Sequence, residues 1–211
     1  MNTRKPFVAM TVVLLLQLLL IRLACYVQAH PLNDADLLIS QLIQRHRSLF
    51  LDELMYGISF HGSIYPVISM VLITAGVYYF RGYIKEAIFV VLTLQAIPVS
   101  YLIKIMVERP RPDSDMIRVI EWNNSASFPS ATVAVFVLFL GFNLLLSLSV
   151  KKFHLPVRKA IWIVSIPFIF LIGFSRIYLG AHWFTDVIGG MIVGLMLLLI
   201  QGWIYLRSGR T

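Results

Sequence analysis

Six long apolar segments constrain the fold of this chain more than any other feature of its sequence. An isolated apolar strand cannot satisfy its backbone hydrogen bonds in lipid, whereas a helix of roughly 20 apolar residues spans a bilayer. The segments approach this length, although the fifth is short and contains Pro167, and they cover residues 7–25, 64–80, 87–107, 129–150, 160–174 and 183–206. Because 59% of the 211 residues are apolar, the sequence predicts an all-α, single-domain membrane bundle of six transmembrane helices.

The basic residues are distributed unequally between the two sides of such a bundle. With the N-terminus in the cytoplasm, the cytoplasmic segments hold ten of the 18 basic residues, and Glu86 is the only acidic residue among them. The ten are Arg4, Lys5, Arg81, Lys85, Lys151, Lys152, Arg158, Lys159, Arg207 and Arg210. This positive-inside pattern predicts that both termini are cytoplasmic. The net charge of +8 is not gathered into a patch that could follow a nucleic-acid backbone, so the expected partner is the lipid bilayer and not nucleic acid.

The first 60 residues contain two segments that each allow two interpretations. Residues 1–30 have a basic start, an apolar core and a Val-Gln-Ala sequence near their end, which is typical of a cleaved signal peptide. Their apolar run is long for a signal peptide and therefore favours a retained first helix. Residues 31–60 are too polar for the bilayer core, and their spaced apolar residues predict one or two interfacial helices on the outer surface. This segment is either a lid beside a lipid entrance or a simple connector, and residues 64–206 form the core.

Polar residues stand at the ends of the third and fourth apolar segments, on the predicted outer side. Lys104 and Arg111 are seven residues apart, which is two helical turns, so both are expected to project toward one patch. The simpler interpretation is that these cations snorkel to the membrane interface. Pro129 and Ser130 open the fourth helix, where free backbone N–H groups and the helix dipole form a ready anion site. A plain helix cap explains Ser130 equally well.

The segment 175–186, Ser-Arg-Ile-Tyr-Leu-Gly-Ala-His-Trp-Phe-Thr-Asp, places charge between the last two apolar segments. Charged residues in such a position are expensive and usually functional. His182 and Asp186 are four residues apart, so on a helix they share one face, and the carboxylate can orient the imidazole as a nucleophile or base. Arg176 adds a forked, permanently charged donor suited to phosphate oxygens. The alternative is a helix-end ion pair beside a structural histidine.

The predicted topology brings all these groups to one pocket on the outer side. Three cations, helix-end N–H donors and a carboxylate-supported histidine form an oxyanion clamp beside a nucleophile, which is the arrangement that phosphoryl transfer requires. The sequence has no acidic cluster that would suggest Mg²⁺, and we expect neither a metal nor another cofactor. The single cysteine, Cys25, excludes an internal disulfide and a cysteine metal cluster.

At these residues the chain resembles the type 2 phosphatidic acid phosphatases, which share a site with the vanadium haloperoxidases. The pattern of that family has three segments: Lys-x6-Arg-Pro, then Pro-Ser-Gly-His, then Ser-Arg-x5-His-x3-Asp. The first and third segments match at every defined position, namely Lys104, Arg111, Pro112, Ser175, Arg176, His182 and Asp186. The resemblance covers residues 64–206, and small bacterial members of the family typically hydrolyse lipid phosphates or polyprenyl diphosphates on the outer membrane face.

The resemblance implies a role for each matched residue. It implies that four residues hold the phosphate of a membrane lipid substrate: Lys104, Arg111, Ser130 and Arg176. It further implies that His182 attacks phosphorus to form a phosphohistidine and that Asp186 orients the imidazole. The expected location is the bacterial inner membrane, with the active site facing the periplasm or the exterior.

The second segment of the family pattern is altered in this chain. Ser130 is followed by Ala131 and Thr132, where the family has Gly and His. The missing histidine is the family's general acid, and the pKa of the Thr132 hydroxyl is too high to replace it near neutral pH. The loss of a general acid typically lowers the rate by about 10² to 10⁴. His61 at the outer mouth of the second helix is the other histidine placed to donate a proton, although a surface histidine is the simpler interpretation.

Three functions follow from these observations. The first is an integral membrane phosphatase that acts on an outward-facing lipid phosphate or polyprenyl diphosphate. The second is a catalytically impaired member of the same family that binds or transports a phosphorylated lipid. The third is a small transporter whose intramembrane cations recognise an anion. Inverted repeats in the sequence would favour a transporter, and the sequence shows no such repeat.

Overall fold

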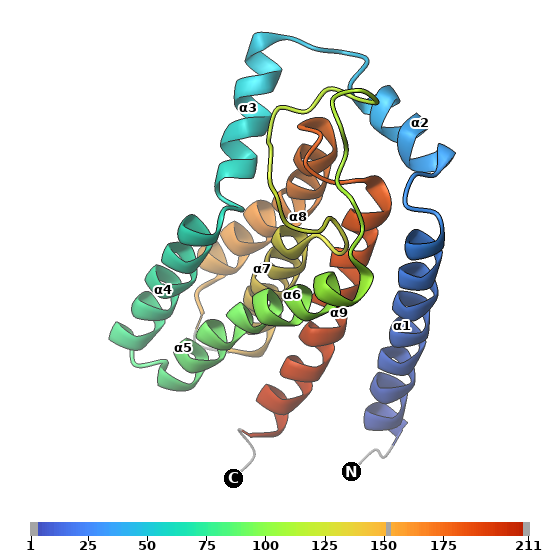
Figure 1. The fold of residues 1–211 in the computed structure, drawn as a ribbon. Helices are drawn as coiled ribbons and strands as arrows, with labels where there is room; N and C mark the ends of the chain where they lie inside the picture. The colour runs from blue at the N-terminus through green and yellow to red at the C-terminus, as the bar shows by residue number, and fades with distance from the viewer. Residues whose placement is uncertain (1–3, 151–152, 209–211) are drawn as a thin grey trace.

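The chain folds into a bundle of helices in a computed structural model that describes residues 4–150 and 153–208, with side chains in the first helix described from Val8 onward. The described residues form helices and loops without a strand, which confirms the all-α prediction. Figure 1 shows the helices α1 (Arg4–Ala29), α2 (Asp34–Ile43), α3 (Leu49–Phe60), α4 (Ile64–Phe80), α5 (Ile84–Val91), η1 (Leu92–Gln95), α6 (Ala96–Val107), α7 (Ala131–Ser149), α8 (Leu155–Tyr178) and α9 (Phe184–Arg207).

Five helical segments in the described chain are long and apolar enough to cross a membrane. They are Val8–Ala29, Ile84–Val107, Ala131–Ser149, Leu155–Tyr178 and Phe184–Arg207. Helices α3 and α4 make a sixth candidate span only when they are taken together as one segment, which is bent by 59°. The span made of α5, η1 and α6 contains a short 3₁₀ segment, because Pro98 has no N–H to donate to the carbonyl of Leu94.

Helix α7 is the centre of the bundle. It is buried over most of its length and packs against α6, α8 and α9 (Figure 1). Two glycines of α9 allow close contact, because a Cβ at Gly190 would lie 2.5 Å from the Ser130 oxygen and one at Gly194 would lie 2.7 Å from the Ala134 oxygen. A side chain at either position would collide with the α7 backbone. The contact places the start of α9 beside the start of α7, where the Ser130 N–H donates to the Asp186 carbonyl at 3.0 Å.

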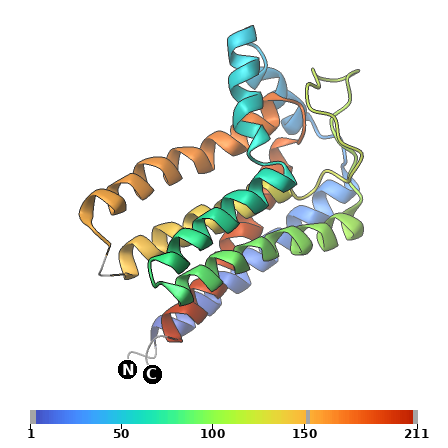
Figure 2. The same cartoon turned by 90° about the vertical axis from the view of Figure 1, so that its left-hand side faces the viewer.

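The two ends of the bundle carry different parts of the chain. Helices α2 and α3, the loop from α6 to α7 and the turn from α8 to α9 lie together at one end (Figures 1 and 2). The start of α1, the turn from α4 to α5 and the end of α9 lie at the opposite end, which therefore holds Arg81, Lys85 and Arg207. Five residues of the predicted cytoplasmic set lie outside the described residues, wholly or in their side chains: Arg4, Lys5, Lys151, Lys152 and Arg210.

Several boundaries differ from the sequence prediction. Helix α7 begins at Ala131 with Ser130 as its N-cap, so Pro129 precedes the helix and does not open it. Helix α8 extends beyond both ends of the predicted segment 160–174, and its last turn includes the Ser-Arg of the third motif. Pro167 lies inside this helix and does not end it. Residues 31–60 form two helices, α2 and α3, which pack on α8 and α9 at the end of the bundle that holds the motifs.

Candidate active site

The three polar segments predicted from the sequence meet at one end of the bundle. Lys104 lies in the last turn of α6, Ser130 is the N-cap of α7, and Arg176 lies in the last turn of α8. The turn from α8 to α9 adds His182. A cavity of about 550 Å³ opens between these elements, and its ionisable and hydroxyl-bearing lining residues include Lys104, Arg111, Glu121, Thr132, Arg176 and His182.

His182 and Asp186 are in contact, but they do not share a helix face as the sequence predicted. His182 precedes α9, whereas Asp186 is in its first turn, where its carboxylate accepts a hydrogen bond from the Trp183 backbone N–H at 2.8 Å. The Asp186 Oδ2 lies 3.6 Å from the His182 Nδ1, and the hydroxyl of Ser127 donates to the same oxygen at 2.5 Å. Both ionisable residues are almost completely buried. The carboxylate is therefore fixed by the helix start and borders one nitrogen of the imidazole.

The second nitrogen of His182 faces positive charge. The Arg111 Nη1 lies 3.5 Å from the His182 Nε2. Burial and the positive charges of Arg111, Arg176 and Lys104 hold the pKa of His182 well below its usual range. The imidazole is therefore neutral at neutral pH, and a neutral imidazole has the free lone pair that nucleophilic attack requires. An anion bound by the cations would lie beside this nitrogen.

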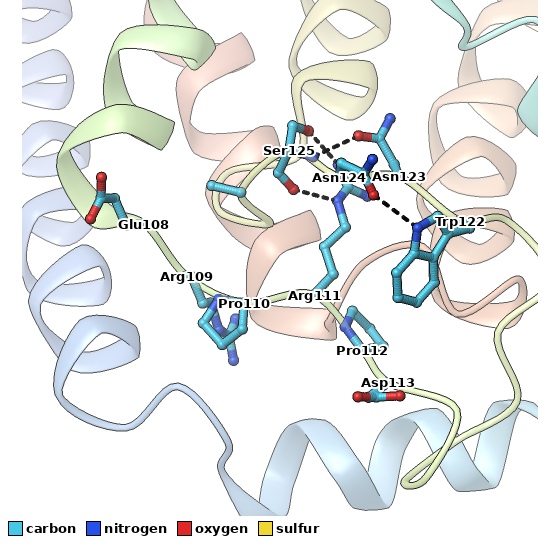
Figure 3. Close-up of a pocket in the computed structure, with 11 residues that line it drawn as sticks. Glu108, Arg109, Pro110, Arg111, Pro112, Asp113, Trp122, Asn123, Asn124 and Ser125 are labelled. Atoms are coloured by element: carbon cyan, nitrogen blue, oxygen red, sulfur yellow. Dashed lines mark hydrogen bonds between the residues drawn. The ribbon is translucent and has the colours of Figure 1, made fainter.

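Lys104 and Arg111 are held by neutral groups. The Lys104 ammonium donates to the backbone oxygens of Ala126 and Ser127, the latter at 3.0 Å. The Arg111 guanidinium donates to the backbone oxygen of Ser125 at 2.7 Å and to that of Ala181 at 2.6 Å, and its reach toward Ser125 is visible in Figure 3. Burial, together with the positive charge of Arg176, lowers the pKa of Arg111 to about 10. Because carbonyls orient these cations without neutralising them, their charge remains available to an anion.

Arg176 differs from the other two cations because it has an anionic partner. Its Nη1 lies 2.6 Å and 2.7 Å from the two carboxylate oxygens of Glu121 and also donates to the hydroxyl of Ser59. Burial alone would raise the pKa of the Glu121 carboxyl, but the ion pair with Arg176 holds this pKa below its usual range. The sequence analysis did not identify Glu121, which lies in a loop and belongs to no motif.

Ser130, Thr132 and His61 occupy different environments. The Ser130 hydroxyl is fully buried without a hydrogen-bond partner in the described structure, and it forms no cap bond to α7. The Thr132 hydroxyl faces the turn before α4 and donates to the carbonyl of Gly62 at 3.1 Å. His61 is exposed, its Nδ1 lies 2.7 Å from the Gly57 carbonyl, and it is not among the residues that line the cavity. The structure thus brings Thr132 to the pocket and leaves His61 outside it.

A buried arginine that the sequence analysis missed supports Asp186. The Arg109 Nη1 lies 2.7 Å from Asp186 Oδ1, and its Nη2 lies 2.6 Å from Asp36 Oδ2. The Asp36 carboxylate also accepts hydrogen bonds from the backbone N–H and the hydroxyl of Thr185. Arg109 and Arg111 leave their loop in opposite directions (Figure 3). The only signal for Arg109 in the sequence is its place in Arg-Pro-Arg-Pro, two residues before the cavity arginine.

A smaller cavity of about 450 Å³ lies against the other side of Arg111. It is lined by residues 108–113 and 122–126 (Figure 3) and shares Arg111, Asn123 and Ser125 with the larger cavity. Hydrogen bonds within this loop, such as that from the Trp122 indole to Asn124 at 2.9 Å, hold its shape. His182 lines the larger cavity and is not among the lining residues of the smaller one, so we assign the chemistry of the site to the larger cavity.

Fold and site together define an α-helical membrane protein with a buried, cation-lined pocket beside a carboxylate-supported histidine. Comparison with known proteins gives the same assignment. The sequence profile of the PAP2 superfamily matches residues 85–210, which include all three motif segments, and the chain belongs to this superfamily.

One relative and two solved structures are similar to most of the chain. Phosphatidylglycerophosphatase B of Bacillus subtilis (strain 168) is 29% identical over 185 residues, which are 85% of this chain and 88% of the relative. The crystal structure of the transmembrane PAP2-type phosphatidylglycerolphosphate phosphatase from Bacillus subtilis superposes with a TM-score of 0.77 at 26% identity, covering 94% of this chain and 98% of that one. The crystal structure of Aquifex aeolicus LpxE matches in fold, with a TM-score of 0.56 at 23% identity over 80% of this chain and 93% of that one.

Proposed function

We propose that this membrane lipid phosphatase of the PAP2 type hydrolyses a lipid phosphate or a polyprenyl diphosphate at the outer membrane face, through a phosphohistidine on His182. The observation that carries the proposal is the position of His182 Nε2, which borders the Arg111 guanidinium in a pocket that also contains Lys104 and Arg176. A phosphate bound by these cations would meet the nucleophile directly. Phosphoryl transfer depends on such positioning and on the stabilisation of charge on the phosphate oxygens.

In the proposed reaction His182 attacks and Asp186 stabilises the charge that develops. The lone pair of His182 Nε2 forms a bond to phosphorus while the bond to the leaving oxygen breaks. The imidazole becomes positively charged, and the Asp186 carboxylate at 3.6 Å from Nδ1 stabilises this charge. Water then cleaves the phosphohistidine and releases phosphate. Lys104, Arg111 and Arg176 neutralise the phosphate oxygens in both steps.

The remaining wall of the cavity supports a lipid as the substrate. Apolar side chains of three helices line it beside the cations: Ile64, Tyr65, Val67, Ile97 and Val135. A phosphate headgroup at the cations would therefore continue into an apolar surface suited to an acyl or prenyl chain. Because the Bacillus subtilis relative is a phosphatidylglycerophosphatase, phosphatidylglycerophosphate is the first lipid to test.

The proposed outer location rests on the separation of charge along the bundle. The motif residues lie at the end opposite to the start of α1 and the end of α9. The described basic residues of the turn from α4 to α5 and of the end of α9 lie at that other end, and the positive-inside rule assigns such an end to the cytoplasm. We propose a bacterial inner-membrane protein with both termini in the cytoplasm.

The test is phosphate release by the purified protein in detergent micelles. Phosphatidylglycerophosphate, phosphatidic acid and farnesyl diphosphate are the substrates, and His182→Ala is the blank, because alanine removes the nucleophile. We expect release by the wild-type protein and none by the variant. Acid-labile ³²P on the wild-type protein after a brief reaction with labelled substrate would identify the phosphohistidine. Equal phosphate release by both proteins would refute the proposal.

One observation favours a second function, which is the binding of a phosphorylated lipid without efficient turnover. The position of the family's general acid holds Thr132, whose hydroxyl donates to Gly62. If this function is correct, the protein binds vanadate through Arg111 and Arg176 but releases no phosphate from any of the three substrates. Vanadate binding and phosphate release, measured on the same purified protein, therefore decide between the two functions.

A further inference from the structure

Glu121 is an acidic residue inside the proposed phosphate pocket. It lines the same cavity as His182 and Thr132, and its side chain is 24% exposed. Its two carboxylate oxygens lie 2.6 Å and 2.7 Å from the Nη1 of Arg176, and the Ser59 hydroxyl donates to Oε2 at 2.6 Å. The backbone N–H of Glu121 donates to the Leu179 carbonyl at 3.2 Å and attaches its loop to the end of α8. The carboxylate is thus held in a defined place at the site of reaction.

The carboxylate of Glu121 occupies one of the donors with which Arg176 can hold a phosphate. The Nη1 of Arg176 cannot donate to a phosphate oxygen and to both Glu121 oxygens at once, so a phosphate that binds this nitrogen displaces the carboxylate. The displaced carboxylate then lies beside a second anion and has lost its cation. Both changes favour the protonated carboxylic acid, as does its partly buried position. Substrate binding, with the uptake of one proton from solvent, therefore converts Glu121 from an ion-pair partner into a proton donor.

We propose that Glu121 is the general acid of this protein: substrate phosphate displaces it from Arg176, and the carboxyl then donates a proton to the leaving oxygen. The proposal rests on the phosphatase function proposed above and supplies the proton donor that Thr132 cannot provide. In the first step His182 Nε2 forms the N–P bond, the P–O bond to the leaving group breaks, and the leaving oxygen takes the Glu121 proton. The products are the alcohol, the phosphohistidine and the Glu121 carboxylate.

The second step restores both residues. The Glu121 carboxylate takes a proton from water, whose oxygen attacks phosphorus, and the N–P bond breaks with its electron pair returning to His182 Nε2. Inorganic phosphate leaves, and Glu121 is protonated again. Over the two steps one water is consumed for each ester bond that is cleaved. One carboxyl group thus acts as acid and then as base, which microscopic reversibility permits.

The leaving group gives the proposal a selective test. A lipid alkoxide is strongly basic and needs a proton to depart, whereas a phosphate leaving group, with a second pKa of about 6, needs little protonation. The test variant is Glu121→Gln, which keeps the size and the hydrogen-bond acceptor but cannot transfer a proton. The matched control is Glu53→Gln, the same substitution at an exposed residue of α3.

We expect Glu121→Gln to lower kcat with phosphatidic acid by about 10² to 10⁴. We expect less than a tenfold loss with farnesyl diphosphate, because its leaving group is a phosphate. The alkaline limb of the kcat–pH profile with phosphatidic acid should disappear, since it reports the loss of the donor's proton. Vanadate should bind at least as tightly as before, because the competing carboxylate is gone. Adding Thr132→His to Glu121→Gln should restore hydrolysis of phosphatidic acid.

Different outcomes overturn different statements. Equal losses with both substrates would overturn the acid role and indicate that Glu121 only supports Arg176. A gain with both substrates would also overturn it and identify Glu121 as a competitor for the phosphate site. If the wild-type and Glu53→Gln proteins bind vanadate but hydrolyse neither substrate, the proposed phosphatase function is wrong, and the proposed role of Glu121 as proton donor is wrong as well. If Glu121→Gln is fully active, only the acid role of Glu121 is overturned.

Discussion

The buried charge network around Arg109 allows a quantitative prediction about stability. Its partners Asp36 and Asp186 are 1% and 0% exposed, and the arginine side chain itself is fully buried. Replacing Arg109 with Met keeps most of the volume but leaves two carboxylates without their cation. Removing one partner of a buried ion pair typically costs about 3–5 kcal/mol. We therefore expect Arg109→Met to lower the free energy of unfolding by this amount, which is a large part of the total stability of a typical domain.

The chain offers a matched control for this prediction. Arg118 pairs with Asp52 at 2.6 Å, but its side chain is 37% exposed, and such pairs typically contribute about 0–1 kcal/mol. Unfolding of the purified protein in detergent, followed by circular dichroism, should therefore show a much smaller effect for Arg118→Met than for Arg109→Met. Adding Asp36→Asn to Arg109→Met should recover part of the loss, because one unpaired charge is removed. Equal effects of the two arginine variants, or no recovery in the double variant, would refute the reasoning.

Three further predictions concern phosphate binding, pH and topology. Arg111→Lys and Arg176→Lys should each weaken vanadate binding by about tenfold or more, because lysine loses the forked geometry; unchanged affinity in both would place the anion site elsewhere. The acid limb of the kcat/KM–pH profile should lie below the ordinary histidine pKa of about 6.5. Burial and the surrounding cations lower the pKa of His182, so its neutral form persists to lower pH. An acid limb above this value would contradict the assignment of His182 as the nucleophile. In a cysteine-free background Ser114→Cys should react with an impermeant reagent from outside and His154→Cys should not, and the opposite labelling would reverse the topology.

Membrane helices and motif residues were predictable from the sequence because their signals are local. Apolar length alone identifies a span, since a bilayer imposes the same thickness on every helix. The seven-residue spacing of Lys104 and Arg111 likewise indicated one patch, and both line the cavity. The relation of His182 to Asp186 was only partly predicted. Their contact arises because Asp186 caps the start of α9, whereas the spacing suggested a shared helix face.

The residues that the sequence did not reveal depend on partners far away in the chain. Arg109 is buried by carboxylates 73 and 77 residues distant, and a loop arginine taken alone indicates solvent exposure. Glu121 is 55 residues from Arg176, in a loop without a motif. Neither position has a periodicity or spacing that marks it. Such residues become visible only when the tertiary fold brings separate segments together.

The distribution of counter-charges leads to a last prediction, about the response of the protein to an anion. Arg109 has two carboxylate partners and Arg176 has one, whereas Lys104 and Arg111 are held by neutral oxygens. A buried cation without a counter-charge destabilises the free protein, and a bound anion relieves this penalty. Vanadate at 100 times its Kd should therefore stabilise the protein by about 2.7 kcal/mol, measured as a shift of its unfolding transition.

Lys104→Met tests the origin of this stabilisation. The variant lacks a cation that has only carbonyl partners, so without vanadate it should lose less stability than Arg109→Met. Its response to vanadate at the same concentration should be greatly reduced, because a charge that binds the anion is missing. Arg118→Met keeps all three pocket cations and should respond as the wild-type protein does. A full vanadate response in Lys104→Met would show that this lysine does not bind the anion, and its carbonyl contacts would then be purely structural.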